Sequence, residues 1–138
     1  MSQQMKDTVQ AYIDLFNARD AQGIADLYAD DATVTDPVGT PPKKGKDEIL
    51  EFYTLAVKNG AKLELVGPTR IAGNSAAFPF KCTVGGMTHV DGDVAVEVDL
   101  PKGGMIIDII DTFQFNEDGK VTEMNAYWGP SNLSLIHI

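Results

Sequence analysis

One stretch near the end of the chain, residues 105–115, constrains the fold more than any other part of the sequence. It reads Met-Ile-Ile-Asp-Ile-Ile-Asp-Thr-Phe-Gln-Phe, which is typical of a β-strand, in which alternate side chains share a face. One face then carries Ile107, Ile109, Asp111, Phe113 and Phe115, and the other carries Ile106, Asp108, Ile110, Thr112 and Gln114. We therefore expect a long strand that places Asp111 among apolar side chains.

This predicted environment has a chemical consequence for Asp111. A carboxylate that is buried without a partner is costly in its ionised form, so such a group takes up a proton. The ordinary pKa of Asp is about 3.9, but in apolar surroundings we expect Asp111 to stay neutral at pH 7 and to donate a hydrogen bond. A buried Asp that is paired with an Arg or with backbone amides is the alternative. The strand alone leaves both interpretations open.

Length and charge limit the classes of protein to which the chain can belong. Its 138 residues, 43% of them hydrophobic, predict a single domain that spans residues 1–138. A net charge of −9 argues against nucleic acid and against an anionic membrane surface as partners. The N-terminus lacks an apolar signal core, and no apolar run reaches the roughly 20 residues of a membrane helix. Cys82 is the sole cysteine, which suits the cytoplasm, where we place the protein.

Hydrophobic periodicity predicts three helices in the first half of the chain. Apolar residues recur at i, i+3, i+4 and i+7 over about residues 5–17 and again from Lys46 to a stop at Gly60. Between them, a short helix begins after Asp20 as its N-cap and closes at Asp31. Each helix turns a tyrosine toward its apolar face: Tyr12, Tyr28 and Tyr53.

The apolar pattern changes to a period of two from residue 63 onward. Strands are predicted over residues 63–66, 76–84, 87–90, 94–100, 105–115 and 121–128. An earlier strand over residues 32–36 ends at Pro37. The fold class is therefore α+β, with three N-terminal helices packed on one face of a curved antiparallel sheet. We expect this arrangement to form a cone with a pocket at its mouth for a small ligand.

Four polar groups are predicted to point inward: Tyr12, Tyr28, Tyr53 and Asp111. Any one of these tyrosines alone is an ordinary core residue, but buried polar groups need partners and can partner one another. A Tyr and a protonated Asp that are aimed at one point make an oxyanion site, in which each donor contributes about 3 kcal/mol. Asp36 either caps a turn before Pro37 or is an ionised base at the pocket mouth, complementary to a neutral Asp111.

Several motifs of cofactor-dependent and covalent chemistry are absent from the sequence. It has no glycine-rich phosphate loop, no Gly-x-Ser-x-Gly motif and no cluster of Cys and His. We therefore expect neither a metal nor an organic cofactor. Cys82 lies in a predicted strand, so we expect a buried thiol rather than a reactive one.

Taken together, several segments resemble bacterial ketosteroid isomerases, or steroid Δ-isomerases, of the SnoaL-like superfamily. These segments are residues 12–17, 27–34, 36–39, 51–53, 110–115 and 124–128. The resemblance implies a cofactor-free homodimer, packed through its sheets, that isomerises apolar Δ5-3-ketosteroids to Δ4-3-ketosteroids. A carboxylic acid that is kept neutral by an apolar site is already a known feature of these enzymes.

The resemblance also implies a role for particular residues. Asp36 is the base that moves a proton from C4 to C6, while Tyr12 and protonated Asp111 hold the 3-oxygen of the dienolate. Tyr28 and Tyr53 extend the hydrogen-bond network behind Tyr12. The apolar substrate slot is lined by Phe52, Phe80, Phe113 and Trp128.

The chain departs from this family between Phe80 and Asp111, where extra residues around 85–104 lengthen a hairpin. The tail at residues 133–138 matches nothing in the family, and we expect it to have no structural role. Two other functions stay open. One is a related cone-fold polyketide cyclase or small-molecule isomerase with a similar Asp, and the other is a non-catalytic binder of apolar ligands.

Overall fold

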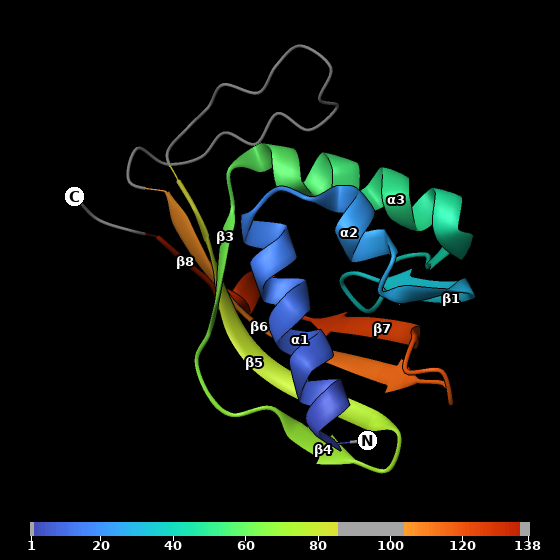
Figure 1. Cartoon of the computed structure of the whole chain (residues 1–138). Coiled ribbons are helices and arrows are strands. Elements are labelled where there is room, and N and C mark those ends of the chain that lie inside the picture. The colour runs from blue at the N-terminus through green and yellow to red at the C-terminus, as the bar shows by residue number, and fades with distance from the viewer. Residues whose placement is uncertain (1, 86–103, 136–138) are drawn as a thin grey trace.

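The computed structural model describes residues 2–85 and 104–135. Three helices, α1 (Ser2–Asn17), α2 (Ala21–Ala25) and α3 (Gly45–Ala56), pack on one face of a curved sheet (Figure 1). The predicted α+β fold is therefore confirmed. Within the described residues, none of the helices combines the length and the apolar character of a membrane span.

The first helix follows its predicted pattern and begins slightly earlier than expected. Its buried side chains are Met5, Val9, Tyr12, Ile13 and Phe16. These positions recur every three or four residues, so one stripe of the helix faces the sheet. The helix ends at Asn17, whose side chain donates to the carbonyl of Leu63 over 2.9 Å and accepts from its amide over 2.8 Å.

The second helix is shorter than predicted. Asp20 caps it as expected, since the carboxylate accepts from the backbone amide of Gly23 over 2.9 Å. The helix ends at Ala25, however, and Tyr28 is the first residue of strand β1 (Tyr28–Thr35). The predicted extension to Asp31 is wrong because the backbone from Tyr28 onward pairs with another strand, and that tertiary pairing outweighs the local helical pattern.

The third helix begins at Gly45, one residue before its predicted start. Asp47 and Glu48 occupy its first turn, where the helix dipole favours acids. A 3₁₀ turn, η1 (Val57–Asn59), extends the helix until Gly60, which has φ of 78°. This left-handed conformation favours glycine, so the predicted stop is confirmed.

Within the described residues the strands form one sheet in the order β2-β1-β7-β6-β5-β3, with β4 beside β5 and β8 beside β6. Their bounds are β2 (Lys43–Lys44), β3 (Lys62–Leu65), β4 (Arg70–Ala72), β5 (Ser75–Val84), β6 (Met105–Phe115), β7 (Val121–Tyr127) and β8 (Leu133–Leu135). The pairs are antiparallel except β1 with β7, which run parallel. The sheet was predicted to be wholly antiparallel, but this pairing of distant segments leaves no trace in local periodicity.

Three short strands were not predicted. β2 lies in a segment predicted as a loop, and β4 has too few residues to show a period. β8 corrects the expectation for the tail, because Leu133 pairs with Ile107 and Leu135 with Met105; a short turn, η2 (Pro130–Asn132), precedes it. The predicted strands at 87–90 and 94–100, within the longer hairpin, lie outside the described residues.

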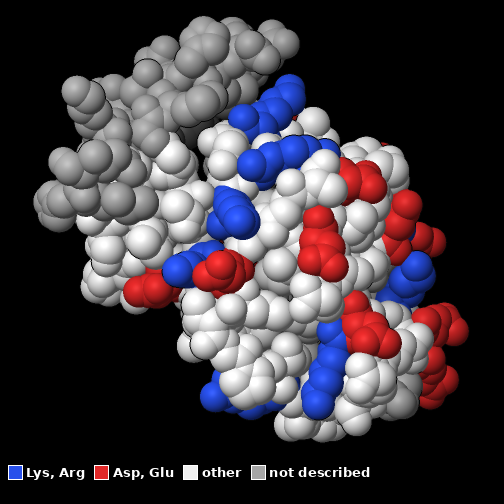
Figure 2. Space-filling view, turned by 60° about the vertical axis from the view of Figure 1, so that its left-hand side comes forward, with Lys and Arg blue, Asp and Glu red and all other residues white. Residues whose placement is uncertain are grey.

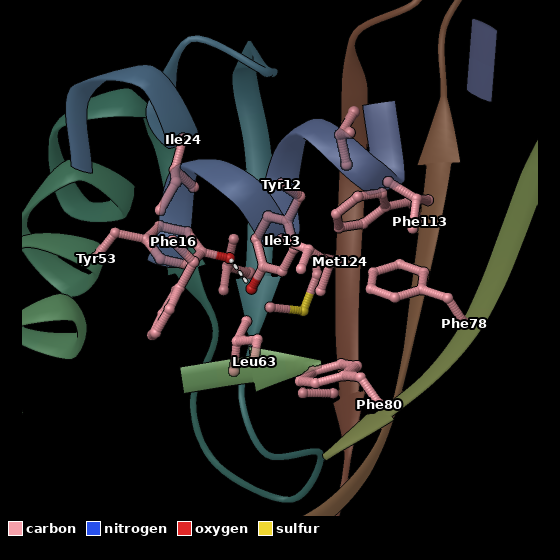
Figure 3. Close-up of a cluster of buried hydrophobic side chains, with 14 of the residues drawn as sticks. Tyr12, Ile13, Phe16, Ile24, Tyr53, Leu63, Phe78, Phe80, Phe113 and Met124 are labelled. Carbon is pink, nitrogen blue, oxygen red and sulfur yellow. Dashed lines mark hydrogen bonds between the residues drawn. The ribbon is translucent and has the colours of Figure 1, made fainter. Parts of the chain in front are cut away.

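The central strand β6 has the predicted bounds and the predicted inner face. Asp111 is 1% exposed, whereas its neighbour Ile110 is 49% exposed on the outer face. Asp111 pairs with Phe78 of β5 and with Ala126 of β7, so neighbouring strands flank it on both sides. In Figure 3, side chains of α1 meet those of β5 and β6 in the core.

The described surface is mixed in charge. On the face seen in Figure 2, Lys and Arg side chains lie among Asp and Glu and uncharged residues. Lys81 and Glu64 form an ion pair of 3.3 Å across β5 and β3. Both side chains are exposed, so the pair contributes little to stability.

Candidate active site

A cavity of about 160 Å³ opens between the helices and the inner face of the sheet. Apolar side chains from α1, α3, β3, β5 and β6 form most of its wall. The wall also includes Tyr12, Asp36, Asn59 and Asp111. A mostly apolar cavity with a few polar groups is the usual form of a small-molecule site.

Asp111 reaches this wall with one carboxylate oxygen unpaired. No described residue forms a hydrogen bond with its Oδ1, so the structure does not show the alternative of a buried pair. Burial raises the pKa of Asp111 well above its ordinary value, and the negative charge of Asp36 raises that pKa further. Both effects favour the protonated acid, which has an O–H to donate into the cavity.

The inward tyrosines form one connected cluster. The hydroxyl of Tyr53 lies 3.2 Å from that of Tyr12 and 2.7 Å from that of Tyr28 (Figure 3 shows the first contact). They come from α1, α3 and β1, and burial raises the pKa of each hydroxyl well above its ordinary value. Tyr12 and Tyr53 line the cavity, whereas Tyr28 lies behind them. The cluster thus supplies neutral hydroxyls in a chain that ends at the cavity.

Asp36 lies one residue beyond the end of β1 and also lines the cavity. Its Oδ1 accepts a hydrogen bond of 2.8 Å from the indole Nε1 of Trp128. Burial raises the pKa of Asp36, while the hydrogen bond from Trp128 and the positive charge of Lys43 lower it. The two acids of the site therefore differ in their surroundings. A donor stabilises the charged form of Asp36, whereas no described residue forms a hydrogen bond with Oδ1 of Asp111.

Three of the four residues expected in the apolar slot line the cavity: Phe52, Phe80 and Trp128. Phe113 does not. It is fully buried, and its ring packs edge-on against Tyr12 with centroids 5.3 Å apart. The reason is its place on β6, one inward position deeper than Asp111.

One part of the cavity wall, the segment from η1 to β3, was not predicted from the sequence. Asn59 of η1, Ala61 and Leu63 of β3 lie there. Asn59 precedes Gly60, and the only signal in the sequence is that of a helix end. Cys82 is buried as predicted and also lines the cavity, where burial raises the pKa of its thiol to about 11.

Within residues 2–85 and 104–135, no group of three His, Cys, Asp or Glu side chains is placed to hold a metal ion.

The chain is similar to known protein families and enzymes whose fold agrees with the one described above. The SnoaL-like domain matches residues 9–124, so the protein belongs to the SnoaL-like family. A steroid Delta-isomerase of Nocardioides simplex is 32% identical over 133 residues, which cover 96% of this chain and 96% of that protein. The resemblance noted in the sequence is thereby confirmed.

Two further proteins are similar to this chain. Epoxide hydrolase LasB of Streptomyces lasalocidi is 29% identical over 140 residues, which cover 94% of this chain but 43% of LasB. The epoxide hydrolase/cyclase-like enzyme SalBIII, studied for pyran ring formation in the polyether salinomycin, superposes with a TM-score of 0.81. It is 22% identical, with 98% of both chains covered. This last likeness shows the fold alone.

Proposed function

We propose that the protein isomerises Δ5-3-ketosteroids to Δ4-3-ketosteroids. The observation that carries this proposal is the meeting of three groups in one apolar cavity: the hydroxyl of Tyr12, the unpaired carboxyl of Asp111 and the hydrogen-bonded carboxylate of Asp36. The similarity to the steroid Delta-isomerase of Nocardioides simplex supports the choice of substrate class.

Tyr12 and Asp111 form the oxyanion site of the proposed mechanism. Removal of a proton from C4, next to the ketone, moves negative charge onto the 3-oxygen as a dienolate forms. Two neutral donors at that oxygen stabilise the transition state more than the ketone, so they lower the barrier rather than merely tighten binding. Tyr53 and Tyr28 continue the hydrogen-bond chain behind Tyr12 and hold its hydroxyl in place.

Asp36 is the base of the same mechanism. Its carboxylate takes the C4 proton and returns it at C6, so the proton and the charge are balanced within one turnover. This step needs a base that is ionised at the working pH yet able to hold a proton transiently. Partial burial and the hydrogen bond from Trp128 act in opposite directions on the pKa of Asp36, which suits this role.

The size of the cavity suggests how the ligand lies. Its volume of about 160 Å³ is close to that of an engineered cavity that binds benzene, about 150 Å³. The ring that bears the ketone therefore fills the part near Tyr12 and Asp111. The remaining rings extend toward the opening.

One assay tests the proposal. Addition of 5-androstene-3,17-dione to the protein is followed by ultraviolet absorbance, and formation of the conjugated enone is the expected signal. An Asp36→Asn variant should form it far more slowly. Absence of the enone with the wild-type protein would overturn the proposal.

Epoxide opening is a second candidate, favoured by the similarity to LasB and by the pair of acids. Protonated Asp111 would give its proton to the epoxide oxygen while Asp36 takes one from the attacking water or hydroxyl. Incubation with an apolar epoxide such as styrene oxide, with mass spectrometry of the diol, tests this chemistry. Tight steroid binding without either product would instead identify a non-catalytic binder.

We also propose that the protein is a homodimer that packs through the outer faces of its sheets. Ile110 and Tyr127 are 49% and 50% exposed, and they pair directly across β6 and β7. Such neighbouring apolar side chains suit a contact with a second copy. Sedimentation should show a dimer that Ile110→Lys dissociates, and a monomeric wild type would contradict this proposal.

A further inference from the structure

Lys43 of β2 lies on the same face of the sheet as Asp36. In the antiparallel pair of β1 with β2, Lys43 is directly opposite Val34. Residues in such a pair point to the same face, and Val34 is fully buried on the inner face. Asp36 follows Val34 by two residues, so it shares that face and lines the cavity. Lys43 and Asp36 are thus diagonal neighbours, whose backbones lie roughly 7 to 8 Å apart.

The ammonium ion of Lys43 is held beside the wall of the cavity. Its Nζ lies 5.8 Å from the ring centroid of Phe52 on α3, which is a cation–π contact. Phe52 lines the cavity together with Asp36. The side chain of Lys43 is half-buried, whereas that of Lys44 is exposed. The contact with Phe52 therefore keeps the charge of Lys43 next to the part of the wall that contains Asp36.

The charge of Lys43 has no close counter-ion in the described part of the chain. The one ion pair found within residues 2–85 and 104–135 joins Lys81 and Glu64, on β5 and β3. Burial raises the pKa of Asp36, while the hydrogen bond from Trp128 and the positive charge of Lys43 lower it. One donor and one cation thus act together against the effect of burial.

The other titratable groups around Asp36 are neutral when Asp36 titrates. Four of them share its cavity, and burial raises the pKa of each: Tyr12 of α1, Tyr53 of α3, Cys82 of β5 and Asp111 of β6. Tyr28 of β1, behind the wall, is also a neutral hydroxyl. The charged residues of α3 lie outside the wall: Lys46, Asp47, Glu48 and Glu51. Among the described residues, Lys43 is then the charged side chain that acts on the Asp36 carboxylate.

We propose that Lys43 is a positioning residue of this site, whose ammonium ion stabilises the anionic form of Asp36 and so keeps the base ready at mildly acidic pH. This inference rests on the proposed isomerase function, in which Asp36 accepts a proton from carbon as a carboxylate. By Coulomb's law, one charge at roughly 7 Å in water-like surroundings changes the ratio of two protonation states about threefold.

The charge state of Asp36 can be followed without any catalysis. Trp128 is the only tryptophan of the sequence, and its indole N–H donates to Oδ1 of Asp36. Protein labelled with ¹⁵N therefore gives one indole resonance, whose position changes as Asp36 takes up a proton. The Asp36→Asn variant should lose this titration, which assigns it to Asp36.

The Lys43→Met variant keeps the length of the side chain and removes its charge. The midpoint of the indole titration should move to higher pH. On the acidic side of the midpoint, the ionised fraction of Asp36 and kcat/KM for 5-androstene-3,17-dione should both fall about threefold. Well above the midpoint kcat/KM should be unchanged, because Asp36 is ionised in both proteins. High salt should reduce the difference between the two proteins, since it screens the charge.

Two further variants separate the charge of Lys43 from its packing. Lys43→Arg keeps the charge and should restore both the indole midpoint and the acidic limb of kcat/KM. Lys44→Met is the matched control, because this neighbouring side chain is exposed and its loss removes the same charge from the same strand. It should behave as the wild type does.

The outcomes distinguish this inference from the proposed function. An indole midpoint that stays in place in Lys43→Met, or that moves as far in Lys43→Arg, would overturn the role of Lys43. An acidic limb of kcat/KM that stays in place while the indole midpoint moves would overturn it as well. A midpoint that moves only in Lys43→Met, in a protein that forms no enone, would support the action of Lys43 on Asp36 and overturn the isomerase proposal alone.

Discussion

Trp128 donates its indole N–H to Oδ1 of Asp36 over 2.8 Å. Each residue lies one position beyond the end of its strand, and the strands β1 and β7 run parallel. Parallel neighbours end at the same edge of a sheet, so the residues that follow them meet. The parallel pair thus positions the proposed base beside its donor.

Loss of this donor should change the pH dependence of the reaction. The hydrogen bond from Trp128 lowers the pKa of Asp36, so Trp128→Phe should raise that pKa. Since the base acts when ionised, the acidic limb of the kcat/KM profile should move to higher pH. Tyr127→Phe, on the outer face, is the control and should leave the profile in place. An unmoved limb in Trp128→Phe would show that Asp36 is not the titrating base.

Removal of the proposed base should abolish most of the activity and leave binding intact. We expect Asp36→Asn to lower kcat about 10³-fold, the range of general base catalysis. Fluorescence of Trp128 should still report steroid binding. Asp31→Asn, an exposed change on the preceding strand β1, should keep the wild-type rate. Full activity of Asp36→Asn would end the assignment of this residue as the base.

Replacement of the buried acid should weaken turnover without unfolding the protein. Asp111→Leu removes a donor from the proposed oxyanion site, and we expect kcat to fall about 10²-fold. Asp111→Asn keeps an N–H donor and should lose less. Circular dichroism checks the fold of both variants. A normal rate in Asp111→Leu would show that the acid is structural.

The same acid should also set how stability depends on pH. Its pKa is raised in the folded protein, so the folded state binds more protons than the unfolded state above the ordinary pKa of Asp. The contribution of Asp111 therefore falls as pH rises from about 4, by at most about 1.4 kcal/mol per pH unit, and levels off above the folded pKa. Urea titrations should show that Asp111→Asn gains stability relative to the wild type across this window. A difference that is independent of pH would contradict the buried neutral acid.

The tyrosine cluster should show graded effects on rate. Tyr12→Phe removes a donor from the proposed oxyanion site and should lower kcat about 10²-fold or more. Tyr53→Phe breaks both contacts of the chain and should have a smaller effect, and Tyr28→Phe, which lies behind the cavity wall, the smallest. Equal losses in the three variants would show that the cluster acts by supporting the fold.

The sequence predicted the inner wall of the site better than its edges. A strict period of two placed Asp111 inward, because a central strand with one buried face fixes the direction of each side chain. Tyr28 was predicted inward but on the wrong element, since local periodicity does not show that β1 pairs with a strand from the far end of the chain. The place of Asn59 in the cavity wall was not predicted, because it depends on how the turn after α3 packs against the sheet and not on a local period.

The position of Asp111 depends on the register of β6 with both neighbouring strands. A slip of one residue against β5 and β7 would put Thr112 in the cavity wall in place of Asp111 and turn the phenylalanines of the core toward water. That exchange is too costly to occur in a folded molecule. Correct pairing of β6 with β5 and β7 therefore also places Asp111 in the cavity wall. No separate rearrangement is needed to position it.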